Sequence, residues 1–231
     1  YGGLGGGNME LCLANEELSR ANEALECRVA DRTKDLVQAN QQLRSEMERR
    51  ERSQAMIVHL AHHDALTGLG NRLLFHKQLS DAAAHRQRHG GDLAVLFIDL
   101  DNFKSFNDRY GYAQGSELIK ETARIIENAV RSRGTADDFV GHIGGDDFVV
   151  ITVPERMRTV SEEVIASFDR RIPEFYDDAD RKNGYILGKS RQGVEMKFPL
   201  ITISIAIVTN ELRNLANPLE TSEIAAELKD Y

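Results

Sequence analysis

Residues 9–58 form an unbroken run of fifty positions without a proline or a glycine. Because these two residues most often interrupt helices, the segment favours one continuous helix. The run is rich in Glu, Arg, Asn and Gln, so its apolar residues make only a narrow seam. Such a seam has little to bury against except a partner helix. We therefore expect a parallel, homodimeric coiled coil; a lone amphipathic helix packed on its own domain is the alternative.

The heptad pattern of this helix changes phase once. Two sets of apolar residues each repeat every seven positions, the second offset from the first by four: Leu11, Leu18 and Leu25, then Val29, Leu36 and Leu43. An offset of four is a stutter, which locally unwinds a left-handed coiled coil. The stretch "LECRVADRTKDL" also resembles the helices that link sensor and output modules in bacterial signalling proteins. We expect an upstream sensor domain.

Charge and cysteine content limit the class of protein. The formal net charge of -8 disfavours binding to a nucleic-acid backbone. Cys12 and Cys27 lie about 22 Å apart along a helix and cannot pair with each other. Two reduced thiols fit a cytoplasmic location. No apolar run approaches the roughly 20 residues of a membrane span, so we expect no membrane segment in this chain.

The remaining sequence predicts a short leader and one globular domain. Residues 1–8, which contain "YGGLGGG", are expected to be a flexible leader, and 59–231 the domain, truncated because the chain stops within a helical pattern. The expected strands are 93–99, 138–143, 147–153 and 200–208, with a hairpin over 184–198 that turns near 191–193. Helices are expected over 113–133 and 157–172, and from near Ser222. This order lacks strict βαβ alternation and favours an α/β (α+β) fold with antiparallel strand pairs.

Four aspartates suggest chemistry. Asp99 ends the strand 93–99 and Asp101 lies two residues further on, while Asp146 and Asp147 follow Gly144 and Gly145. If strand and hairpin are neighbours, Asp99 meets Asp146 or Asp147 at one edge of the sheet. Such carboxylates need a cation between them, and oxygen ligands favour Mg²⁺ or Mn²⁺. The alternative is that the acids are turn residues and helix caps, with Asp101 as an N-cap.

The segment that follows offers groups that bind a nucleotide. "NFKSFND" is expected to begin a helix, and the backbone N–H groups near Asn102, Phe103 and Lys104 are free to hold a phosphate. Asn107 carries a donor and an acceptor, which suits the edge of a purine.

Three motifs together resemble the GGDEF domains, the diguanylate cyclases: "DALTGLGNR" (64–72), "DLDNFKSFND" (99–108) and "GGDDF" (144–148). The resemblance implies a nucleotidyl-cyclase or palm-like fold, with a largely antiparallel five-stranded sheet flanked by helices. It also implies an activity. Two subunits, each holding one GTP, meet face to face and form cyclic di-GMP with release of two pyrophosphates.

The resemblance assigns roles by position. Asp99 and Asp146 hold two metal ions with the carbonyl of Leu100. Asp147 is a catalytic residue that stands where the family usually has Glu and has a shorter reach, and Gly145 lets the nucleotide approach. The amides of residues 102–104 hold phosphate, and Asn107 reads guanine. A coiled coil raises the effective concentration of one half-site near the other.

The chain departs from the family pattern at the base-reading motif, "GYAQGS" (111–116). Tyr112 replaces the usual His, and Ser116 replaces an Asp that accepts hydrogen bonds from guanine. A serine tolerates adenine too, and a subgroup with serine here makes cyclic GMP-AMP. Three readings stay open: a diguanylate cyclase, a hybrid cyclase using GTP and ATP, and an inactive nucleotide-binding module.

Other departures lie near the turn and at the chain's end. The product-inhibition motif RxxD reads "TADD", keeping only Asp138, so we expect weak or absent inhibition. His142 replaces a common arginine. The family's phosphate-gripping Lys and Arg would follow Tyr231.

Overall fold

The computed structural model describes residues 5–189 and 195–210. Internal contacts divide the chain into two units, Tyr1–Val58 and His59–Tyr231. Helix α1 (Gly5–His62) begins inside the range predicted as a leader, and it ends after the boundary predicted at residue 58. The predicted turn near 191–193 and the predicted helix from Ser222 lie outside the described residues.

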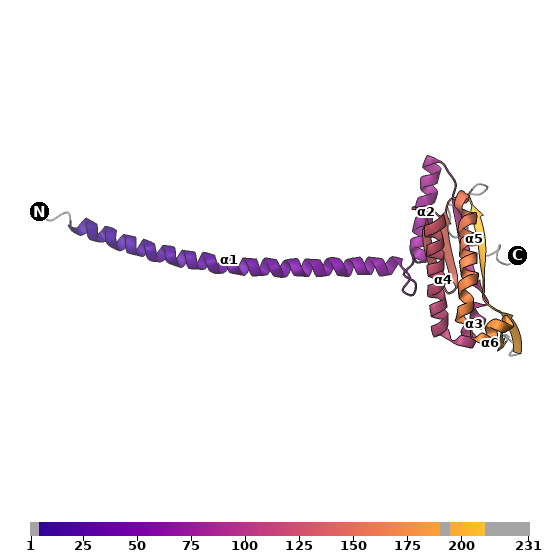
Figure 1. Cartoon of the computed structure of the whole chain (residues 1–231). Helices are drawn as coiled ribbons and strands as arrows, with labels where there is room; N and C mark the ends of the chain where they lie inside the picture. Colours follow the sequence, from indigo (N-terminus) through magenta and orange to yellow (C-terminus); the bar gives the residue numbers. More distant parts are fainter. Residues whose placement is uncertain (1–4, 190–194, 211–231) are drawn as a thin grey trace. The chain divides into compact units, whose positions relative to one another are not determined.

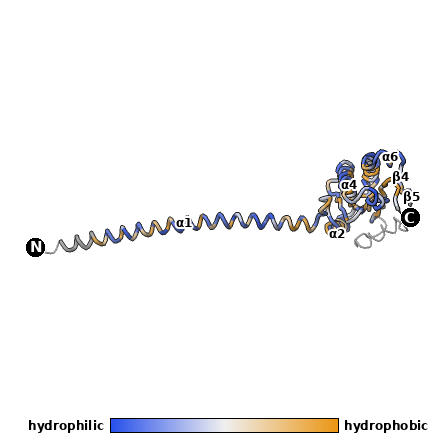
Figure 2. The backbone as a smooth tube through the Cα atoms, turned by 90° about the horizontal axis from the view of Figure 1, so that it is seen from below, coloured by the Kyte–Doolittle hydropathy of each residue, from blue (hydrophilic) through white to orange (hydrophobic). Residues whose placement is uncertain are grey.

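The first unit is a helix whose apolar residues are exposed. In Figure 2, hydrophobic positions recur along a mostly hydrophilic α1. The exposed side chains include members of both heptad sets: Leu18, Leu25, Val29, Leu36 and Leu43. Ion pairs one turn apart, such as Glu46 with Arg50 at 3.0 Å, support a solvent-facing helix. Pairing of this seam with a second copy stays a prediction.

The second unit is built on a four-stranded antiparallel sheet in the order β2-β3-β1-β6. Its strands are β1 (Ala94–Asp101), β2 (Phe139–Gly144), β3 (Asp147–Thr152) and β6 (Thr202–Thr209). Strands β4 (Tyr185–Lys189) and β5 (Glu195–Pro199) pair with each other in a separate hairpin. The sheet expected to have five strands has four in the described part of the chain, and β4 and β5 lie outside it.

Helices cover both faces of this sheet (Figure 1). The helices of this unit are α2 (Arg72–His89), α3 (Phe103–Tyr110), α4 (Tyr112–Arg133), α5 (Pro154–Arg171) and α6 (Asp178–Asn183), with a 3₁₀ turn η1 at Ile172–Phe175. Helix α2 lies on one face of the sheet and α4 and α5 on the other, whereas α6 lies beside β4. Alternate residues of β1 point to opposite faces. Leu96 and Ile98 join a core cluster with α4 and α5, whereas Val95 and Phe97 join a second cluster with α2.

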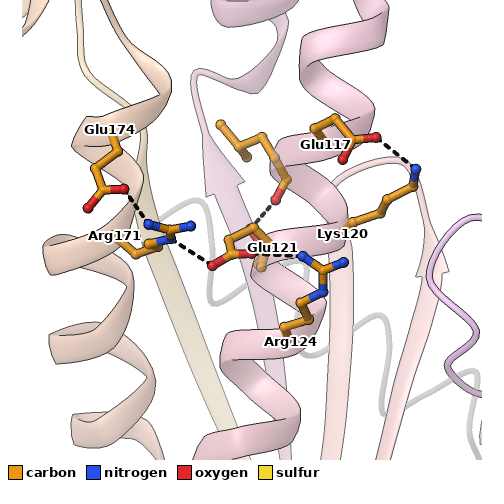
Figure 3. Close-up of polar contacts among 8 residues, drawn as sticks. Glu117, Lys120, Glu121, Arg124, Arg171 and Glu174 are labelled. Carbon is orange, nitrogen blue, oxygen red and sulfur yellow. Dashed lines mark hydrogen bonds and ion pairs between the residues drawn. The ribbon is translucent and has the colours of Figure 1, made fainter.

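An ion-pair network joins α4 to α5 on the outside of the domain (Figure 3). Arg171 of α5 donates to Glu121 of α4 at 2.8 Å, and Glu121 also pairs with Arg124 at 3.1 Å. Burial raises the pKa of the Glu121 carboxyl, but its bonds to Arg171 and Arg124 outweigh burial and leave the pKa lowered. The network adds a polar contact to the apolar packing of the two helices.

Candidate functional site

The acidic residues lie at one end of the sheet, beyond the residues of β1 that pack against α2. Val95, Phe97 and Asp99 share a face of β1, and α2 packs on the first two. The last β1–β3 pair is Ile98 with Phe148, so Asp99 and Asp147 follow it on adjacent strands. The apolar face thus changes into an acidic edge.

The turn between β2 and β3 holds the second acidic element. Gly144 pairs with Asp147, which leaves Gly145 and Asp146 as the two turn residues. The φ angles of Gly144 and Gly145 are 133° and 62°, values that glycine adopts most easily. The strand register also shifts between His142 and Gly144. The two glycines therefore allow the sharp turn that carries Asp146.

Three carboxylates meet at this edge. One oxygen from each of Asp99, Asp146 and Asp147 lies within 4.8 Å of the others, and all three residues are half-buried. Mutual repulsion at this range is relieved by a cation, and an all-oxygen donor set suits a hard divalent ion. The group could therefore hold a metal ion. Leu100, whose carbonyl was predicted as a further ligand, follows Asp99 in β1 with its side chain buried.

Asp101 takes a different role from Asp99, although β1 runs through both. Its carboxylate accepts hydrogen bonds from Thr202 at 2.7 Å and Ser204 at 2.8 Å, both on β6. The N-cap of α3 is Asn102, so the expectation that Asp101 caps this helix is wrong. Asp101 was not distinguishable from Asp99 by spacing alone, because its partners lie a hundred residues away.

Helix α3 begins in an unusual conformation. Asn102 has φ 65°, in the left-handed region that Asn tolerates better than most residues, and its side chain does not cap the helix. Its carbonyl accepts the N–H groups of Ser105 and Phe106. The N–H groups of Phe103 and Lys104, in the first turn, have no intrahelical acceptor and can serve an anion.

The proposed base-reading residues lie on two helices that meet at Gly111. Asn107 on α3 has a buried Oδ1 that lacks a hydrogen-bond partner in the described part of the chain. On α4, Ser116 Oγ donates to the carbonyl of Tyr112 at 2.9 Å. The Tyr112 ring itself is 79% exposed. Asn107 and Ser116 therefore differ in the hydrogen-bonding groups that they can offer to a ligand.

Helix α3 is anchored by a carboxylate that the sequence did not reveal. Buried Asp180 of α6 accepts hydrogen bonds from Tyr110 at 2.6 Å and Arg109 at 3.1 Å. The Tyr110 bond is the main cause that lowers the pKa of the Asp180 carboxyl. Burial, followed by the Asp180 bond, raises the pKa of Tyr110 to about 12. These bonds hold the C-terminal end of α3, and α3 carries Asn107.

His142 links the 64–72 segment to the glycine turn. Its buried ring stacks on Phe148, with Nδ1 2.9 Å from an Asp64 oxygen and Nε2 3.1 Å from the Gly145 carbonyl oxygen. The Asp64 contact has ion-pair distance but is not aligned as a hydrogen bond. Burial raises the pKa of Asp64, yet the contacts with His142 and Thr67 outweigh it and lower the pKa overall. His142 therefore lies between the 64–72 motif and the glycine turn and contacts both.

A cavity of about 390 Å³ lies at the opposite end of the sheet, beside Asp138. Asp138 accepts hydrogen bonds from the backbone and hydroxyl of Thr135 and from the Thr152 hydroxyl, at 3.0, 2.6 and 2.8 Å. The Asp138 carboxylate thus links Thr135 to Thr152 within the domain. Weak product inhibition through Asp138 stays a prediction, and these internal bonds are in line with it.

Comparison with known proteins identifies the family to which this fold belongs. Residues 61–184, more than half of the chain, match the family model "Diguanylate cyclase, GGDEF domain". The chain therefore belongs to the GGDEF family. None of the helices in the described residues combines the length and apolarity needed to cross a membrane.

Related proteins and structures agree. The chain is 39% identical over 123 residues to diguanylate cyclase TpbB of Pseudomonas aeruginosa, covering 51% of this chain and 27% of that one. It is 47% identical over 88 residues to diguanylate cyclase DgcS of Shewanella oneidensis, covering 38% and 28%. The matched region thus spans about a quarter of each curated relative.

Two solved structures resemble the fold. The GGDEF domain of TpbB aligns with a TM-score of 0.52 and 29% identity, covering 72% of this chain and 87% of that one. The coiled coil and GGDEF domain of DgcB from Caulobacter crescentus, in complex with c-di-GMP, aligns with a TM-score of 0.55 and 25% identity, covering 80% and 82%. These likenesses confirm the predicted α/β fold.

Proposed function

We propose that this chain is a diguanylate cyclase, which condenses two GTP molecules into cyclic di-GMP. The observation that carries the proposal is the convergence of Asp99, Asp146 and Asp147 at the glycine turn of a GGDEF domain. In each of two reactions, the 3′-oxygen of one GTP forms a bond to the α-phosphorus of the other, and the bond to pyrophosphate breaks. The hydroxyl proton passes to a base or to solvent.

The carboxylates of the acidic edge would hold two divalent ions in each site. Asp99, Asp146 and the carbonyl of Leu100 would hold Mg²⁺ or Mn²⁺, which offsets the charge of the triphosphate and of the attacking oxygen. Asp147, the first residue of β3, lies beside them as a further catalytic residue, with one methylene less than the Glu that is usual in the family. Gly145 carries no side chain, so the nucleotide can approach the turn closely.

The start of α3 would hold the phosphates. The N–H groups of Asn102, Phe103 and Lys104 lie at the N-terminal end of α3. The positive end of the helix dipole lies there and favours anions. Lys104 is exposed and adds a positive charge.

The reaction needs two copies of the domain. Each copy presents one GTP, so neither can close the product ring alone. Pairing of two α1 helices through their exposed seam would keep two domains at a high effective concentration. We further propose that the signal comes from an upstream sensor domain and that the reaction takes place in the cytoplasm.

A second candidate, a hybrid cyclase making cyclic GMP-AMP, is favoured by the bonding of Ser116. Its hydroxyl proton is used on the Tyr112 carbonyl, so it offers lone pairs to a ligand. Asn107 has its oxygen buried, so its amide N–H₂ is the end left to donate. One donor beside one acceptor matches O6 and N1–H of guanine, and equally N1 and N6–H₂ of adenine.

One incubation separates these functions. The full chain with Mg²⁺ receives GTP, ATP or both, and the products are identified by mass spectrometry. Cyclic di-GMP from GTP alone supports the first proposal, and cyclic GMP-AMP from the mixture supports the second. Nucleotide binding without either product would contradict both and indicate an inactive binding module. The Asp146→Ala variant, which removes one proposed metal ligand, is the control for a contaminating enzyme.

A further inference from the structure

We propose that Gly115 is a positioning residue for purine recognition: by having no side chain, it lets Asn107 lie against the first turn of α4. This inference rests on the proposed function, because it concerns the side of the site that reads the base. The role of Gly115 is to provide space for another side chain, which differs from the backbone role of the glycines in the turn.

The geometry begins at Gly111, which ends α3 and precedes α4 with φ 84°. Its N–H donates to the Asn107 carbonyl at 2.8 Å, and its carbonyl accepts the N–H of Gly115 at 3.1 Å. The sharp corner between the helices therefore brings the Asn107 side chain against Gly115.

There is no room for a side chain at residue 115. A Cβ atom there would overlap Asn107 Oδ1 and would lie 2.9 Å from its Cγ and 3.3 Å from Cζ of Phe103. By contrast, a Cβ at Gly144 or Gly145 would meet no atom within 4 Å, because those glycines serve the turn. Gly115 itself is helical and buried, so its backbone does not require glycine.

Helix stability also argues against glycine at this position. Glycine inside a helix is less favourable than alanine, because it loses more backbone freedom on folding. Asn107 Oδ1 occupies the space that an alanine methyl would take, and it is the movable end of a side chain. An alanine would therefore leave the fold intact and turn the Asn107 amide away from its present orientation.

The test uses five full-length proteins: wild type, Gly115→Ala, Asn107→Ala, the double variant, and Gln114→Ala as a matched change at an exposed position of the same helix turn. Two quantities are measured. NMR records the side-chain amide signals of Asn107 without nucleotide, assigned by their loss in Asn107→Ala. Calorimetry records binding of a non-hydrolysable GTP analogue with Mg²⁺.

We expect Gly115→Ala to shift the Asn107 amide signals and weaken analogue binding about tenfold, close to the effect of Asn107→Ala. The double variant should bind within about twofold of Asn107→Ala, because the two changes remove one contact. Gln114→Ala should resemble wild type in both measurements. The thermal midpoint of Gly115→Ala should equal or exceed that of wild type.

Unchanged Asn107 signals in Gly115→Ala would overturn the inference, and so would shifted signals with unchanged binding. Additive losses in the double variant would also overturn it, because Gly115 would then act independently of Asn107. If wild type binds no analogue at all, the proposed function fails and the recognition role of Gly115 fails with it. The NMR shift then still decides whether Gly115 sets the orientation of Asn107.

Discussion

The acidic edge and the corner between α3 and α4, which we propose as two parts of one nucleotide-binding site, are built differently. The edge brings together three charged side chains from β1 and the β2–β3 hairpin. The corner has neutral side chains, Asn107 and Ser116, on two helices joined at Gly111. The edge keeps carboxylates at all three of its positions, whereas the corner has lost the family's Asp at residue 116.

Because the two parts differ in charge, we expect them to control different properties of the reaction. Charges at the edge would act on the triphosphate, which is the same in GTP and ATP. The corner would act on the base, through hydrogen bonds that depend on small changes in donor and acceptor placement. Changes at the edge should therefore abolish the reaction, and changes at the corner should alter which nucleotide is used.

The largest effect is expected from Asp99→Asn, which removes a charge from the three-carboxylate group. We expect pyrophosphate release with Mg²⁺ and GTP to fall by about a thousandfold or more, because a proposed metal ligand is lost. Asp101→Asn is the matched control on the same strand, since Asp101 bonds to β6 instead. Equal losses in both variants would show that the acidic edge has no special role.

Ser116→Asp should increase the selectivity of the corner for guanine over adenine. A carboxylate accepts hydrogen bonds from N1–H and N2–H₂ of guanine but meets the N1 lone pair of adenine unfavourably. We expect the preference for GTP over ATP, measured as the ratio of the two Kd values, to rise by about tenfold. An unchanged ratio would mean that residue 116 does not contact the base.

Asp180→Asn tests the support beneath the corner. The folded-state pKa of Asp180 is lowered, so its stabilisation is present above the unfolded-state pKa of about 3.9 and is lost as pH falls through the folded value. We expect the variant to lose about 1–3 kcal/mol of unfolding free energy at pH 7 and less at pH 3. Denaturant titration at both pH values measures this, and exposed Asp178→Asn is the control. A loss that is the same at both pH values would contradict the assigned role.

The smallest effect is expected from Glu121→Gln, outside both parts of the site. Loss of the charged bonds to Arg171 and Arg124 should lower Tm by roughly 1–3 °C and leave nucleotide choice unchanged. Glu162→Gln breaks an exposed pair with Arg158 within α5 and should leave Tm unchanged. A change in the GTP/ATP preference of Glu121→Gln would contradict this expectation, because Glu121 lies outside both the acidic edge and the corner.

The sequence predicted the parts of the fold that local patterns determine. The strand predicted at 93–99 is β1, which extends to Asp101, and the helix predicted at 113–133 is α4. The hairpin at the glycines also follows from local turn chemistry. The convergence of Asp99 with the hairpin depended on which strands are neighbours, and the family resemblance supplied that information.

Contacts between distant segments were not predictable in the same way. Asp101 finds its partners on β6, and Asp180 reaches Tyr110 from 70 residues away, so no spacing rule applied. His142 was noticed only as a replacement for arginine, and its contact with Asp64 required the fold. For Gly115 a signal did exist, because a single glycine inside a helical pattern suggests close approach by another group.

We propose above that Asp99 and Asp146 bind the same divalent ions beneath a triphosphate. The most direct measurement is a crystal of the full chain grown with Mn²⁺ and a non-hydrolysable GTP analogue, with manganese located by its anomalous scattering. We expect manganese to be coordinated directly by oxygens of both aspartates and to bridge to phosphate. Manganese bound elsewhere, or an analogue whose phosphates lie away from the β2–β3 turn, would contradict it.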